Sequence, residues 1–127
     1  MIIDKQMESI LILDDDLNLC MALNDELAEV GYDTNFYTNA DTALDFVNEK
    51  NVDLILLDLK MPNKDGFDVL HDLNEKGFHG KVIVLTAYAD VKSAIESAKL
   101  GATDFISKPY DFDELLITIR KVLQRDQ

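Results

Sequence analysis

The stretch DLILLDLKMPNKDG, residues 53–66, predicts both a structural unit and a site. Its apolar run Leu54–Leu57 is typical of a buried strand, and the run ends directly at an acid, Asp58. An ionised carboxylate is costly at the end of a buried strand unless a partner or a function keeps it there. Helical spacing from about Phe67 to Lys76 follows, and Gly77 is a natural stop. The stretch therefore predicts a strand, a loop and a helix with an acid at the junction.

The same alternation of strand-like runs and helix-like spacing extends over the whole chain. It predicts five strands, at about residues 9–13, 34–37, 53–57, 81–85 and 104–107. Runs that are apolar on both faces are typical of a parallel sheet covered by helices on both sides. We therefore expect one α/β domain over residues 1–127. Its sheet would be doubly wound and flavodoxin-like, with strand order 2-1-3-4-5 and five flanking helices.

Composition limits the functions that this domain can have. Twenty-five acidic and 12 basic residues among 127 give a formal net charge of −13, which argues against direct binding of nucleic acid. The single cysteine, Cys20, excludes an internal disulfide and favours a reducing compartment. The first residues, MIIDKQMES, lack the features of a signal peptide, and no apolar run reaches membrane-spanning length. We expect a cytoplasmic domain that does not enter a membrane.

Polar side chains follow four of the five predicted strands at the point where each strand ends. They are Asp14, Asp15, Asp16, Asp58, Thr86 and Lys108. Because the carboxyl ends of parallel strands meet at one edge of the sheet, we expect these side chains to converge there. Close carboxylates repel one another, and a hard divalent cation relieves that repulsion. An all-oxygen set favours Mg²⁺ over Zn²⁺, and His71 and His79 are expected on the surface away from this edge.

Such a cluster can also perform chemistry at phosphorus. A carboxylate can act as a nucleophile if a metal and hydrogen-bond donors stabilise the charge on the phosphoryl oxygens. In this interpretation Asp14 and Asp15 hold the metal, Thr86 donates a neutral hydrogen bond, Lys108 supplies a positive charge and Asp58 is the acceptor. Taken singly, each residue also has a purely structural explanation, but their joint placement does not.

These features resemble the receiver domains of two-component response regulators. The resemblance covers essentially the whole chain and is carried by ILILDDD, LILLDLKMPNKDG, VIVLTA and FISKPYDFDEL. It implies that Asp58 is the phospho-acceptor in a two-component system or phosphorelay. It also implies that Mg²⁺ is bound by Asp15 directly and by Asp14 largely through water, together with Asp58 and the backbone carbonyl of Lys60. The donor would be the phosphohistidine of a sensor histidine kinase or of a phosphotransfer protein.

The resemblance further implies a conformational switch. Thr86 and Lys108 would contact the phosphoryl group, Thr86 would move inward, and Phe105 would rotate into the vacated space. A cis peptide is expected before Pro109. The fourth helix, fifth strand and fifth helix (about residues 90–124) would then present a changed surface to a partner, and this surface could also form a homodimer. Such a domain promotes its own phosphorylation and dephosphorylation without being an enzyme in the usual sense.

Several alternatives stay open from the sequence alone. Tyr88 either shields the phosphoryl group beside Lys60 or is a rim aromatic without a kinetic role. Asp14 and Asp16 also fit the Asp-x-Asp spacing of Mg²⁺-dependent phosphohydrolases of the haloacid dehalogenase type, although that leaves Asp58 unexplained. A flavodoxin-like nucleotide binder fails on charge, because DDDLN would repel phosphate. An interaction module without phosphorylation, and a receiver within a longer regulator rather than a stand-alone one, are the remaining options.

Overall fold

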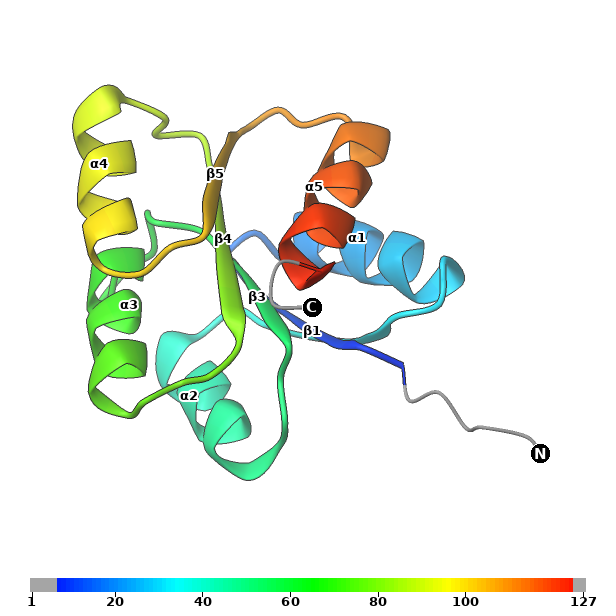
Figure 1. The fold of residues 1–127 in the computed structure, drawn as a ribbon, viewed down its shortest axis with the longest axis horizontal. Helices are drawn as coiled ribbons and strands as arrows, with labels where there is room; N and C mark the ends of the chain where they lie inside the picture. The colour runs from blue at the N-terminus through cyan, green and yellow to red at the C-terminus, as the bar shows by residue number, and fades with distance from the viewer. Residues whose placement is uncertain (1–6, 125–127) are drawn as a thin grey trace.

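Strands and helices alternate strictly along residues 7–124, the part of the chain that the computed structural model describes (Figure 1). The strands are β1 (Ser9–Leu13), β2 (Asp33–Tyr37), β3 (Leu54–Leu57), β4 (Lys81–Thr86) and β5 (Asp104–Ser107). The helices are α1 (Leu17–Glu29), α2 (Ala40–Glu49), α3 (Gly66–Glu75), α4 (Val91–Lys99) and α5 (Phe112–Gln124). These bounds differ from the predicted strand ranges by one residue at most, and α3 begins one residue earlier than predicted.

All four strand pairings are parallel, and the strand order is β2-β1-β3-β4-β5. The prediction of a doubly wound, flavodoxin-like sheet of this order is therefore confirmed. Figure 1 shows α1 and α5 on one side of the sheet and α2, α3 and α4 on the other. Strand order reverses between β1 and β3, so their carboxyl ends form the crevice where open α/β sheets bind ligands.

The central strands carry two cores because their side chains alternate between the two faces. Leu11, Leu13, Ile55 and Leu57 face the core under α2 and α3. The intervening residues of β1 and β3 face the core under α1 and α5, and they are Ile10, Ile12, Leu54 and Leu56. Both strands are buried along their whole length, which fixes the positions of the residues that follow them.

The outer strands are less buried than the sequence pattern suggests. No residue of β2 or β5 is fully buried, and Asp33 and Ser107 are exposed. Both strands lie at an edge of the sheet, which leaves one side without a neighbouring strand. The expectation of strands that are apolar on both faces therefore holds for the three central strands. No helix within residues 7–124 combines the length and apolarity needed to cross a membrane.

Candidate functional site

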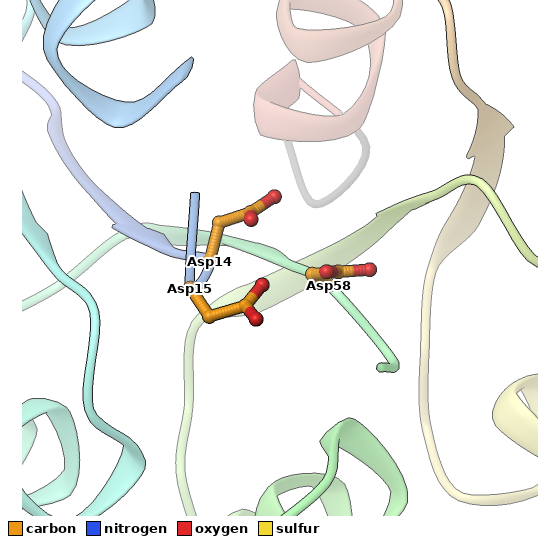
Figure 2. A group of neighbouring side chains, drawn as sticks. All are labelled: Asp14, Asp15 and Asp58. Atoms are coloured by element: carbon orange, nitrogen blue, oxygen red, sulfur yellow. The ribbon is translucent and has the colours of Figure 1, made fainter. Parts of the chain in front are cut away.

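Three carboxylates gather where β1 and β3 end (Figure 2). The parallel register pairs Leu13 with Leu57, so the next residues along each strand, Asp14 and Asp58, emerge side by side. The Asp58 N–H continues the ladder by donating to the carbonyl of Leu13 at 3.0 Å. One carboxylate oxygen each from Asp14, Asp15 and Asp58 lies within 4.8 Å of the others. The predicted convergence of these acids therefore occurs in the structure.

Burial makes this gathering of negative charge costly. Asp14 is 2% exposed and Asp58 is 6% exposed, whereas Asp15 faces solvent. Burial raises the pKa of Asp14; hydrogen bonds from Lys108 and from the Asp16 N–H oppose the rise, and the charge of Asp58 adds to it. A cation placed among these oxygens would relieve the repulsion.

Lys108 supplies the one ammonium group that reaches the acids among the described residues. Its backbone N–H donates to the carbonyl of Thr86 at 2.8 Å, which continues the β4–β5 pairing past the strand ends. Its Nζ lies 2.6 Å from Asp14 Oδ2 and 3.7 Å from Asp58 Oδ2. Burial alone would lower the pKa of Lys108, but the hydrogen bond to Asp14 and the nearby carboxylates raise it above its ordinary value. Lys108 is therefore a cation near neutral pH. Its peptide bond to Pro109 is cis, as expected.

A cleft of about 660 Å³ opens above the acids. Asp14, Asp15, Asp58 and Lys108 line it, together with Lys60 and Tyr88. The sequence pattern does not single out four further lining residues, and these are Met61, Pro62, Asp65 and Ala87. Met61 and Ala87 directly follow the predicted site residues Lys60 and Thr86, whereas Pro62 and Asp65 share only the β3–α3 loop with Lys60. The cleft can admit a phosphoryl group together with a cation.

Thr86 and Phe105 occupy places that the cleft does not expose. Thr86 is fully buried, and its Oγ1 accepts a hydrogen bond from the Tyr88 N–H at 3.2 Å. That contact leaves the hydroxyl proton of Thr86 available as a donor. Phe105 is half-buried and packs against the core under α2 and α3. Neither residue lines the cleft in this structure, so their predicted part in a switch stays a prediction.

The loop between β3 and α3 forms one wall of the cleft. The Lys60 N–H donates to Asp58 Oδ1 at 3.4 Å, and the Gly66 N–H donates to the Leu59 carbonyl at 2.9 Å. A Cβ on Gly66 would lie 2.5 Å from the Asp58 carbonyl oxygen and 2.6 Å from Leu59 Cα. Only glycine allows this close return of the chain beneath the end of β3.

Two side chains meet across the mouth of the cleft. Lys60 Nζ lies 5.1 Å from the centre of the Tyr88 ring, within the range of a cation–π contact. Lys60 comes from the β3–α3 loop and Tyr88 from the β4–α4 loop, so the contact joins two opposite walls. Tyr88 is 54% exposed. Both residues line the cleft, so a shielding role for Tyr88 stays a prediction.

The two histidines lie away from the acids, as predicted. His71 is on α3, where it pairs with Glu75 at 3.5 Å, and His79 is exposed before β4. His79 instead lines a second cleft, of about 640 Å³, at the amino-terminal edge of the sheet. Among residues 7–124, the only group of three or more potential metal ligands is the carboxylate cluster of Asp14, Asp15 and Asp58.

Comparison with known proteins places the chain in a family. The sequence profile of the response regulator receiver domain matches residues 10–120. Sporulation initiation phosphotransferase F of Bacillus subtilis is 37% identical over 116 residues, which cover 91% of this chain and 94% of that protein. Regulatory protein AtoC of Escherichia coli is 36% identical over 115 residues, but these cover 91% of this chain and only 25% of that protein.

Solved receiver domains have the same architecture. The receiver domain of a Francisella response regulator superposes with a TM-score of 0.88 at 31% identity, covering 94% of this chain and 99% of that domain. A CheY-like receiver domain of Methanospirillum hungatei gives a TM-score of 0.89 at 28% identity, covering 93% of this chain and 94% of that domain. These matches do not favour the phosphohydrolase or the interaction module. The chain belongs to the response regulator receiver domains, the phosphoryl-accepting modules of two-component systems and phosphorelays.

Proposed function

We propose that Asp58 is the phospho-acceptor of this receiver domain. One carboxylate oxygen of Asp58 would attack the phosphorus of a phosphohistidine as the bond between phosphorus and nitrogen breaks, and the histidine would leave with a proton. The observation that supports this most directly is the joint placement of three carboxylates and Lys108 around one cleft. Asp58 directly follows the central strand β3 at the floor of the site, 3.7 Å from the ammonium nitrogen of Lys108.

The donor set fits Mg²⁺ as the cofactor. Asp14, Asp15 and Asp58 offer oxygen ligands only, and the backbone carbonyl of Lys60 is the expected fourth. Neither thiolate nor imidazole lines the cleft among the described residues, so the set does not suit Zn²⁺. When bound, Mg²⁺ would neutralise charge on the phosphoryl oxygens and relieve the repulsion between the acids.

Lys108 and Thr86 would stabilise the charge on the transferred group. Lys108 would exchange its hydrogen bond to Asp14 for one to a phosphoryl oxygen, over a distance that its flexible side chain can cover. Thr86 would donate its free hydroxyl proton to a second oxygen. Because Thr86 is fully buried, this requires the β4–α4 loop to move toward the site. The domain would promote both its own phosphorylation and the hydrolysis of the product.

The movement of Thr86 would alter the surface that α4, β5 and α5 form. Phe105, half-buried on β5 next to β4, would rotate inward as the β4–α4 loop shifts. This surface carries three exposed apolar side chains, on Val91, Ile95 and Ile117. Since exposed apolar groups favour association, this surface is our candidate for the output partner or for a homodimer. Phosphorylation would shift a population between two nearly balanced conformations.

The phosphodonor requires a surface of its own beside the cleft. Leu17 and Met21 are 52% and 50% exposed and lie one turn apart on α1, directly after the acids of the site. We propose this patch as the contact for a sensor histidine kinase or phosphotransfer protein, with residues 1–127 acting as one cytoplasmic receiver domain. Residues 1–6 and 125–127 of that range lie outside the described residues.

Chemical trapping of the phosphorylated residue tests this proposal. The chain is incubated with phosphoramidate and Mg²⁺ and then treated with sodium borohydride, which reduces an acyl phosphate to an alcohol. Peptide mass spectrometry is expected to find homoserine at position 58. Homoserine at position 14 would instead support the phosphohydrolase alternative, and no modification would leave the acceptor role without support.

A further inference from the structure

The β3–α3 loop, residues 59–65, is tied to two helices through Lys64. Its ammonium group forms an ion pair with Asp72 on α3 and a longer one, at 3.6 Å, with Asp41 on α2. The hydrogen bond to Asp72 raises the pKa of Lys64, and the same bond lowers the pKa of Asp72. Lys64 and Asp72 are each 30% exposed, so both groups lose much of their contact with water.

The loop that Lys64 ties has a shape that its backbone alone does not favour. Asn63 has a φ of 72°, in the left-handed region, which a side-chain-bearing residue adopts at some cost. The Lys64 N–H donates to the Pro62 carbonyl at 2.9 Å, so the chain turns sharply directly before the ion pairs. Asparagine adopts this region more readily than most residues, and the ion pairs of Lys64 add contacts outside the loop to this turn.

This loop carries the groups that close the site on one side. Lys60, Met61 and Pro62 line the cleft, and Lys60 is the residue whose carbonyl is expected to complete the Mg²⁺ site. We propose that Lys64 is a positioning residue: its ion pairs with Asp72 and Asp41 hold the β3–α3 loop in its binding shape and so increase the affinity of the site for Mg²⁺. This inference rests on the Mg²⁺ site of the proposed function.

Simple charge effects predict the opposite result, which makes the inference testable. Lys64 carries a positive charge near an acidic site, so its removal should strengthen the binding of a cation if only long-range charge matters. If Lys64 positions the loop, its removal should instead weaken binding. Because the ion pairs are partly exposed, we expect a modest effect, a loss of about two- to fivefold in Mg²⁺ affinity.

The experiment measures Mg²⁺ binding by isothermal titration calorimetry on the full chain at low salt. Lys64→Met removes both ion pairs, Lys64→Arg retains them, and Asp72→Asn removes the shorter one. The matched control is Lys76→Met, which removes the charge of an exposed lysine at the far end of α3. Thermal unfolding in the presence of EDTA checks that each variant is folded, because that measurement does not depend on Mg²⁺.

We expect weaker Mg²⁺ binding for Lys64→Met and Asp72→Asn, and normal binding for Lys64→Arg. The double variant Lys64→Met, Asp72→Asn should bind no more weakly than Lys64→Met. Backbone amides of the loop should also exchange hydrogen faster in Lys64→Met. Binding by Lys64→Met that equals or exceeds that of Lys76→Met would overturn the inference while leaving the proposed function intact. If the unmodified chain bound no Mg²⁺, both would be overturned.

Discussion

Lys108 donates a hydrogen bond of 2.6 Å to Asp14, whereas its Nζ remains 3.7 Å from Asp58, the proposed acceptor. Asp14 and Lys108 lie 94 positions apart in the sequence and directly follow β1 and β5, which are separated in the sheet by β3 and β4. Lys108 therefore pairs more closely with an expected metal ligand than with the proposed acceptor. We therefore expect Lys108 and Mg²⁺ to compete for Asp14, and Lys108 to become available to a phosphoryl group once the metal is bound.

The first prediction concerns Lys108→Met. Removing the competing cation should strengthen Mg²⁺ binding by about tenfold, because a unit charge at such a distance contributes roughly 1 kcal/mol or more. The same change should slow phosphorylation by acetyl phosphate by about 10²-fold, since the developing charge loses its donor. In Lys108→Met without Mg²⁺, the buried Asp14 and Asp58 lose their cationic partner, so the unfolding free energy should fall by about 1–3 kcal/mol relative to the unmodified chain. Calorimetry measures the Mg²⁺ affinity, intact mass against time gives the phosphorylation rate, and chemical denaturation gives the unfolding free energy. An unchanged Mg²⁺ affinity would argue against competition between Lys108 and Mg²⁺ for Asp14.

The second prediction compares two glycines. In Gly66→Ala the new Cβ would overlap the Asp58 carbonyl oxygen at 2.5 Å, so the β3–α3 loop must shift and phosphorylation should fall sharply. In Gly31→Ala nothing lies within 4 Å of the new Cβ. The loss of stability then comes only from the backbone, because Gly31 has a φ of 107° that alanine adopts poorly. Gly31→Ala should therefore lose thermal stability but keep the phosphorylation rate of the folded protein. Equal phosphorylation rates in both variants would contradict the close packing beneath Asp58.

The third prediction concerns the lifetime of the phosphorylated state. If the Lys60–Tyr88 contact limits access of water, Tyr88→Ala should accelerate dephosphorylation by about two- to fivefold, as expected from an exposed cation–π contact. Tyr88→Phe keeps the ring and should behave like the unmodified chain. Loss of the phosphorylated mass after removal of the donor gives the rate. An unchanged rate in Tyr88→Ala would show that Tyr88 is only a rim aromatic.

The fourth prediction uses the buried cysteine. Cys20 is fully buried and its thiol donates to the Asp14 carbonyl at 3.3 Å. Burial, aided by the charges of Asp14 and Asp16, raises the pKa of Cys20 from 9.0 to about 12. Between these two values the folded state retains a proton that the unfolded state loses. The contribution of Cys20 to stability is therefore complete below pH 9 and is lost as pH rises toward about 12.

Chemical denaturation at a series of alkaline pH values tests this. The unfolding free energy should fall by up to about 1.4 kcal/mol per pH unit from this one proton. Cys20→Ala should show a shallower decline over the same range, because its remaining slope comes from other groups such as Lys108. The native thiol should also resist alkylation. Identical slopes in the two proteins would mean that the thiol ionises as easily folded as unfolded.

The convergence of the acids was predictable from the sequence because it depends on periodicity alone. Apolar runs locate β1 and β3, a parallel register aligns their ends, and Asp14 and Asp58 must then emerge together. The ammonium group of Lys108 follows from the same reasoning at the end of β5. Backbone geometry thus determines which residue types meet at this edge.

The arrangement of side chains within the site could not be predicted in the same way. The choice of Asp14 over Asp58 as the partner of Lys108 depends on rotamers and burial, which no sequence pattern encodes. The ion pairs of Lys64 join the β3–α3 loop to α2 and α3, and they depend on a turn in which the backbone of Asn63 is in the left-handed region. The exposure of β2, by contrast, agrees both with its place at the edge of the sheet and with its sequence DTNFY, in which three of the five residues are polar.

The most direct test of the central claim is the intact mass of the chain after incubation with acetyl phosphate, with and without Mg²⁺. We predict the gain of one phosphoryl group that requires Mg²⁺ and that is absent in Asp58→Asn. Asp16→Asn is a suitable control, because Asp16 lines the cleft but caps α1 by accepting from the Leu19 N–H. A phosphoryl group that persists in Asp58→Asn at the normal rate would contradict the account and place the acceptor elsewhere.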